Sequence, residues 1–236
     1  RAPHLRNLRD VLTELPAVKD EVEGLSKILK GKFLYNVKAN EHSFKTIAQE
    51  YGIIHLAMHG ILDTEFPILS SLAFSEDGDS LEDNFLQAYE ISHLKLNADL
   101  VVLSACETGY GKFQQGEGVM SLARSFMYAG VPSLVVSLWQ VNDASTALIM
   151  QSFYKNLAKG MDKAEALCKA KLSYLRRAGN IAAHPAFWAP FIQLGDSRPI
   201  SIQAQNSGLL VWWIGGGGMV LLGIGGFAMR RRKKEL

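Results

Sequence analysis

Two short, strongly apolar runs constrain the fold of this chain more than any other feature of its sequence. The first run spans residues 53–60 and ends in His59-Gly60, and the second begins at Leu100 and reaches Cys106. Runs this short and apolar, separated by helical sequence, are typical of strands that are buried on both faces of a parallel sheet. The two runs therefore predict an open α/β fold, in which ligands bind beyond the carboxyl ends of the strands.

A histidine and a cysteine stand at these two predicted strand ends. A cysteine thiolate is a nucleophile, and a histidine can take up the thiol proton and later release it to a leaving group. His59 precedes Cys106 by 47 residues, which is near the roughly 50-residue spacing found in caspases. Together they predict a cysteine nucleophile site with His59 as the general base and Cys106 as the nucleophile.

Further motifs occur in a fixed order around these residues, and together they resemble the CHAT domain, a bacterial relative of caspases and separases. Beyond His59-Gly60, they occupy residues 104–109, 116–118, 122–124, 128–130, 137–143, 164–167 and 184–191. The resemblance covers residues 15–196. It implies a caspase-like three-layer α/β/α sandwich with a mostly parallel sheet, and a cysteine-type endopeptidase that uses neither a metal nor an organic cofactor.

The resemblance also implies roles for further residues of the site. The backbone N–H groups of Gly60 and Cys106 would form an oxyanion hole. Asp143 and Trp139 would line a specificity pocket that selects Arg or Lys before the scissile bond. The residues themselves leave a second role for Asp143 open, because aspartate is a preferred N-cap and a helical segment begins at Ala144.

Other reactive residues are expected to have no catalytic role. His55 lies four residues further from the strand end than His59, so we expect a core histidine that is bonded to a neighbour; the pair also lacks a third ligand for zinc. Cys168 is expected to pack within a helix that Asp162 caps. The glycines near Lys112 do not have the spacing of a nucleotide-binding loop.

The remaining pattern alternates helices and strands, as a three-layer fold requires. We expect helices over residues 16–29, 44–52, 89–94, 117–128, 143–157 and 162–177. We expect strands over residues 32–35, 133–139 and 191–194, and an edge hairpin near residues 69–80.

Residues 209–229 carry no charge and predict a single transmembrane helix. A helix of this length spans about 31 Å, close to the roughly 30 Å of a hydrocarbon core. Five Lys or Arg follow in the tail (residues 230–236), whereas the linker (residues 197–208) carries only Arg198. The positive-inside rule predicts a cytoplasmic tail and a domain on the exoplasmic side. A tail anchor with an internal domain and a sorting tail that is cleaved are the alternatives.

These observations predict a membrane-anchored cysteine endopeptidase that acts on a protein or peptide substrate. Residues 1–14 would link it to upstream tetratricopeptide repeats, which the family commonly carries. These repeats or a separate partner would regulate it. Without the terminal basic cluster the chain is mildly acidic, so no nucleic-acid footprint is left. The alternatives are a non-catalytic scaffold or interaction module and an acyl-transfer reaction at the same thiol.

Overall fold

The fold is organised around a four-stranded sheet with the strand order β1-β5-β6-β7. A computed structural model describes residues 16–63, 65–76, 82–104, 117–139 and 142–202. β1 (Ile53–Leu56), β5 (Leu100–Leu103) and β6 (Ser133–Ser137) run parallel, and β7 (Phe191–Gly195) pairs antiparallel with β6. The predicted α/β class with a mostly parallel sheet is confirmed, and β7 makes the sheet mixed.

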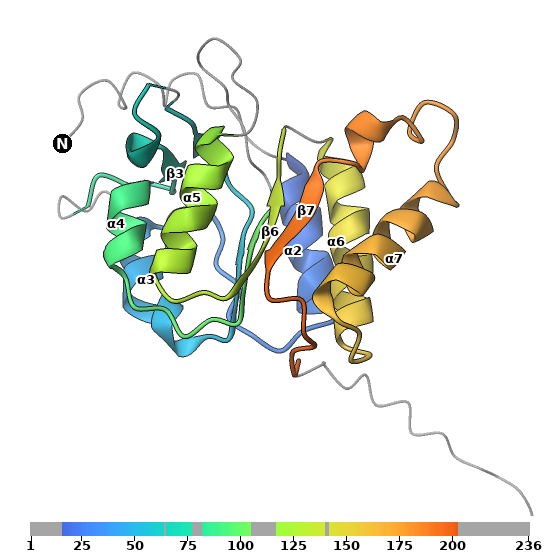
Figure 1. Cartoon of the computed structure of the whole chain (residues 1–236), viewed down its shortest axis with the longest axis horizontal. Helices are drawn as coiled ribbons and strands as arrows, with labels where there is room; N and C mark the ends of the chain where they lie inside the picture. The colour runs from blue at the N-terminus through green and yellow to red at the C-terminus, as the bar shows by residue number, and fades with distance from the viewer. Residues whose placement is uncertain (1–15, 64, 77–81, 105–116, 140–141, 203–236) are drawn as a thin grey trace, which may run out of the picture. The chain divides into compact units, whose positions relative to one another are not determined.

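Helices cover both faces of this sheet, because side chains along each strand point alternately to opposite faces (Figure 1). Val101 and Leu103 belong to one apolar core, which includes residues of α3 (Glu41–Ile47), α4 (Ala88–His93) and α5 (Glu117–Tyr128). Leu100 and Val102 belong to the other core, with residues of α2 (Pro16–Ser26), α6 (Asp143–Leu157) and α7 (Lys163–Leu175). All four residues of β5 are fully buried, so this strand lies in the middle layer of an α/β/α arrangement.

A second, three-stranded antiparallel sheet divides the first apolar run of the sequence. It contains β2 (Gly60–Ile61), β3 (Ser71–Ala73) and β4 (Phe85–Gln87). We predicted one strand over residues 53–60, which is wrong: β1 ends at Leu56 and Gly60 pairs with Leu72 of β3. The chain has to turn between these pairings because the two sheets are separate, and His59 lies in this connection. The predicted edge hairpin is confirmed by the antiparallel pairing of β3 with β4.

The other predicted elements agree with the structure except at two places. The helix expected over residues 44–52 begins earlier and is not one α-helix, because α3 (Glu41–Ile47) is followed by the 3₁₀ helix η2 (Ala48–Glu50). The strand expected over residues 32–35 is wrong: Tyr35 has an extended backbone, but these residues belong to no strand, because a strand also needs a hydrogen-bonded neighbour. The helices over residues 117–128 and 143–157 have the predicted bounds, and Asp162 caps α7 by accepting the Glu165 N–H at 2.7 Å. Short 3₁₀ helices complete the described chain: η1 (Asn36–Lys38), η2 (Ala48–Glu50), η3 (Pro67–Leu69) and η4 (Pro185–Phe187).

The membrane prediction concerns residues that the structure does not describe. Residues 16–202, within the ranges given above, include no helix that is both long enough and apolar enough to cross a membrane. The predicted transmembrane segment (residues 209–229) and the basic tail lie outside the described residues. At the start of the predicted linker, Ile200 and Ile202 pack against the core of α2, α6 and α7.

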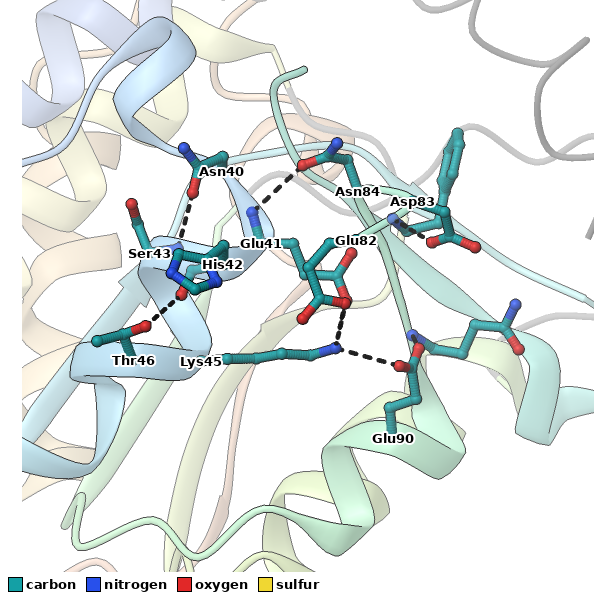
Figure 2. Close-up of polar contacts among 12 residues, drawn as sticks. Asn40, Glu41, His42, Ser43, Lys45, Thr46, Glu82, Asp83, Asn84 and Glu90 are labelled. Carbon is teal, nitrogen blue, oxygen red and sulfur yellow. Dashed lines mark hydrogen bonds and ion pairs between the residues drawn. The ribbon is translucent and has the colours of Figure 1, made fainter. Parts of the chain in front are cut away.

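A lysine surrounded by three carboxylates connects α3 to α4 (Figure 2). Lys45 Nζ lies 2.7 Å from Glu41 Oε1, 2.9 Å from Glu82 Oε2 and 3.2 Å from Glu90 Oε1. The Glu41 side chain is only 1% exposed, and this burial raises the pKa of its carboxyl. Burial lowers the pKa of Lys45, but its bonds to Glu41 and Glu82 more than compensate and leave that pKa above its ordinary value. The ammonium therefore holds together carboxylates that would otherwise repel one another.

We predict that Lys45→Met lowers the free energy of unfolding by about 3 to 5 kcal/mol, because it leaves the buried Glu41 carboxylate without its cation. Chemical denaturation measures this value. The loss is expected to be smaller at pH 5 than at pH 7.5. Burial holds the folded-state pKa of Glu41 above its unfolded value, so protonation of this carboxyl favours the folded state as the pH falls.

The matched control is Lys19→Met, which also removes a lysine that is paired with a glutamate one helical turn away. Lys19 is 75% exposed and lies 3.9 Å from Glu23, so its loss should cost less than about 0.5 kcal/mol. Equal losses in the two variants would show that the Lys45 cluster contributes no more than a surface ion pair.

Candidate active site

The carboxyl ends of β1 and β5 meet at one edge of the central sheet. Leu56 and Leu103, the last residues of the two strands, are register partners. The Ser104 N–H donates to the Leu56 carbonyl at 3.1 Å and continues the ladder by one hydrogen bond. Each predicted catalytic residue follows its strand by three positions, since His59 comes after Leu56 and Cys106 comes after Leu103.

The backbone around His59 and Gly60 is held by the second sheet. The His59 carbonyl accepts the Ala73 N–H at 2.9 Å, and Gly60 is buried opposite Leu72. The His59 side chain is half-buried. Residues 105–116, which include Cys106, lie outside the described residues. The structure therefore describes β5 and Ser104 but not the thiol.

Trp139 and Asp143, the predicted specificity residues, follow β6, which is the next strand in the sheet. The Trp139 indole Nε1 donates to the Ala186 carbonyl at 3.3 Å, which ties this strand end to η4. The alternative role of Asp143 as an N-cap is wrong. Asn142 is the N-cap of α6, with its side-chain oxygen accepting the Ser145 N–H at 3.3 Å, and Asp143 is the first residue of the helix.

A buried polar network lies beside the paired ends of β1 and β5. We call it the Glu21 network, and it consists of Glu21, His55, Ser104 and Tyr154. His55 Nε2 lies 3.1 Å from Glu21 Oε1, and His55 Nδ1 lies 3.1 Å from the Tyr154 hydroxyl. The Ser104 hydroxyl lies 3.3 Å from Glu21 Oε2 and 3.2 Å from His55 Nε2. The prediction that His55 is a core histidine bonded to neighbours is confirmed.

The donors and acceptors of the Glu21 network assign the position of each proton. Burial raises the pKa of Tyr154 well above its usual range, and the charge of Glu21 raises it further, so the phenol keeps its proton. Carboxylate oxygens only accept hydrogen bonds, so the contact of His55 Nε2 with Glu21 Oε1 places a ring proton on Nε2. This N–H and the Ser104 hydroxyl both donate to the Glu21 carboxylate.

The same protonation pattern excludes Ser104 as an alternative nucleophile with His55 as its base. The Ser104 hydroxyl donates to Glu21, and His55 Nε2 carries a proton and has no lone pair to accept another. Ser104 is also only 2% exposed. The contact between Ser104 and His55 is therefore structural.

Our sequence reasoning did not identify Glu21, although one signal marks it. Val18, Val22 and Leu25 form the apolar face of α2, and Glu21 falls on this face at helical spacing from Val18 and Leu25. A carboxylate in such a position needs a buried partner. The prediction for Cys168 is wrong: it is exposed, because it lies one residue, and thus about 100° around α7, from the buried Leu167.

A cavity of about 1330 Å³ lies beside β1 and includes both His55 and His59 in its lining. Residues of α2, α3 and the segment 29–36 form its other walls. His59 is thus one of the residues that border the cavity along β1. Among the described residues, no group of three His, Cys, Asp or Glu side chains could hold a metal ion.

Comparison with known proteins agrees with this geometry. The chain is 31% identical over 128 residues to tetratricopeptide repeat protein 28 of Homo sapiens, and 29% identical over 116 residues to that of Mus musculus. These matches cover 52% and 49% of this chain but only 5% of either relative, so the chain spans about one twentieth of their length. The model of the CHAT domain family matches residues 4–196. With most of its length matched, the chain belongs to the CHAT domain family.

Proposed function

We propose that this domain is a cysteine endopeptidase that uses a dyad of Cys106 and His59. One observation carries the proposal: both residues follow, by the same three positions, the paired ends of two adjacent parallel strands. Parallel strands place such segments at one edge of a sheet, which is the usual ligand site of an α/β fold. The cavity beside β1, whose lining includes His59, has room for a polypeptide substrate.

The proposed reaction proceeds through a covalent thioester. His59 takes the proton of the Cys106 thiol, and the sulfur attacks the carbonyl carbon of the scissile peptide bond. The N–H groups of Gly60 and Cys106 are the proposed donors to the oxyanion that forms. The carbon–nitrogen bond then breaks as His59 returns the proton to the leaving amine, and a water molecule that His59 activates hydrolyses the thioester.

We further propose that Asp143 and Trp139 select a basic residue before the scissile bond. Because Asn142 caps α6, the N-cap role does not account for the aspartate at position 143. A carboxylate there can form a charge-assisted hydrogen bond with Arg or Lys.

The rest of the predicted protein also remains a proposal. We propose that the domain is anchored by residues 209–229 as a single-pass protein with residues 230–236 in the cytoplasm. We also propose that tetratricopeptide repeats precede it and regulate its activity. Both relatives are named as tetratricopeptide repeat proteins, which supports the proposal of upstream repeats.

The first prediction concerns the nucleophile. An irreversible peptidyl probe with Arg next to its electrophile should label the wild type and Cys168→Ser at Cys106, and His59→Gln should be labelled at least about 100-fold more slowly. Mass spectrometry of the modified peptide identifies the labelled thiol. Cys168→Ser is the matched control because Cys168 is exposed and can react without any active site. Labelling that persists in Cys106→Ala, or a full-length protein that is never labelled at Cys106, would favour the non-catalytic scaffold.

A second prediction separates substrate selection from helix capping. Asp143→Ala should lower kcat/KM for substrates with Arg before the scissile bond by roughly 10- to 100-fold, as expected when a hydrogen bond to a charged group is lost. Asn142→Ala should instead lower the free energy of unfolding by about 1 kcal/mol and leave the substrate preference unchanged. If both variants lose stability and neither changes the preference, Asp143 does not line the pocket.

A third prediction concerns topology. A reporter that is active only in the cytoplasm should be active when fused after Leu236 of the full-length protein, because five basic residues precede this end. The same reporter inserted between Arg198 and Pro199 should be inactive. Activity at both sites would place the domain in the cytoplasm.

A further inference from the structure

The Glu21 network joins four segments of the fold near the edge of the central sheet, where the chain leaves β1 and β5 toward the two residues of the proposed dyad. Glu21 comes from α2, His55 from β1 and Tyr154 from α6, and Ser104 directly follows β5. Glu21 and Ser104 are each 2% exposed, Tyr154 is fully buried, and the His55 side chain is 13% exposed. The network is therefore an enclosed part of the interior and not a surface ion pair.

The position of this network along the strands connects it to the dyad. His55 is the residue before the last one of β1, and Ser104 is the first residue after β5. The side-chain contact between them is diagonal, because His55 is the register partner of Val102, and it crosses the two strands next to the hydrogen bond from the Ser104 N–H to the Leu56 carbonyl. The chain reaches His59 four residues after His55, and it reaches Cys106 two residues after Ser104.

Packing alone gives no reason for a carboxylate at this place. α2 already contributes Leu25 to an apolar core that contains Met150 and Phe153 of α6. Burying a charge is costly unless every partner is in place, and networks that are fully satisfied fix one arrangement of the elements they join. With its two oxygens, the Glu21 carboxylate accepts from a side chain of each strand, so it sets the ends of β1 and β5 relative to each other.

We infer that Glu21 is a positioning residue for the Cys106–His59 dyad and acts through His55 and Ser104. The inference rests on the proposed function. Its effect is to hold the ends of the two strands that lead to His59 and Cys106 at a fixed separation. Tyr154 completes the network through its hydrogen bond with His55 Nδ1.

The first test compares two carboxylates of α2. Glu21→Gln keeps the shape of the side chain but removes the charge and one acceptor, and it should lower kcat roughly 10- to 100-fold, the size of effect expected when reacting groups are slightly misplaced. KM should change less than about twofold, because the substrate contacts are untouched. Asp20→Asn is the control: Asp20 is exposed on the same helix and is not among the residues that line the cavity beside β1, so its substitution should change neither constant. Assays are run well below the melting temperature of each variant, so that unfolding does not account for the loss.

A double-mutant cycle tests whether the effect passes through His55. Tyr154→Phe removes only the hydroxyl that is hydrogen-bonded to His55 Nδ1 and should also lower kcat. If both substitutions act by releasing the same imidazole, the loss in Glu21→Gln/Tyr154→Phe should be far smaller than the product of the two single losses. Independent, multiplicative losses, or variants that melt at lower temperature with unchanged kcat, would overturn the inference.

A further readout separates this inference from the proposed function. Imidazole NMR signals of His59, assigned with His59→Gln, should shift or broaden in Glu21→Gln and stay unchanged in Asp20→Asn. If the wild type is inactive but the His59 signal responds to Glu21→Gln alone, the endopeptidase proposal fails and the positioning role holds. If the wild type is active and the His59 signal does not respond, the positioning role fails and the proposed function stands.

Discussion

The pairing of Leu56 with Leu103 at the ends of β1 and β5 is the constraint on which the rest of this structure depends. Parallel pairing forces both chains to leave the sheet at the same edge, so the residues that follow them share one region of space. Helices pack on both faces of the sheet and keep the strands in place, and β5 is fully buried. A single rung of backbone hydrogen bonds thus brings the segments that lead to the two candidate residues, His59 and Cys106, to one edge of the sheet.

Two charged clusters serve different purposes in this fold. Lys45 contacts three carboxylates and ties α3 to α4, so its substitution acts mainly on stability. In the Glu21 network the carboxylate accepts hydrogen bonds from His55 Nε2 and from the Ser104 hydroxyl. A charge held only by hydrogen bonds depends strongly on the geometry of its donors. This dependence is why the Glu21 network can orient strand ends, whereas the Lys45 cluster holds two helices together.

The sequence did not identify residues, such as Glu21, that act through their neighbours. Apolar periodicity located α5 and α6 with the correct bounds, and it located both strands that precede His59 and Cys106. It could not show that the chain turns after Leu56, because the run stays apolar into β2 of the second sheet. Adjacent residues of a helix face different environments, so the sequence pattern also misplaced the exposed Cys168.

The sequence by itself determined the α/β class, the family and the two candidate reactive residues, because strand length, apolar pattern and motif order are properties of the chain alone. Only the tertiary structure decided that His55 is bonded to Glu21 and Tyr154, that Ser104 joins them, and that Asn142 rather than Asp143 caps α6. These outcomes depend on which side chains from distant segments arrive within hydrogen-bond distance. Periodicity reports which way a residue faces along its own element, whereas the identity of its partner follows from how the elements pack.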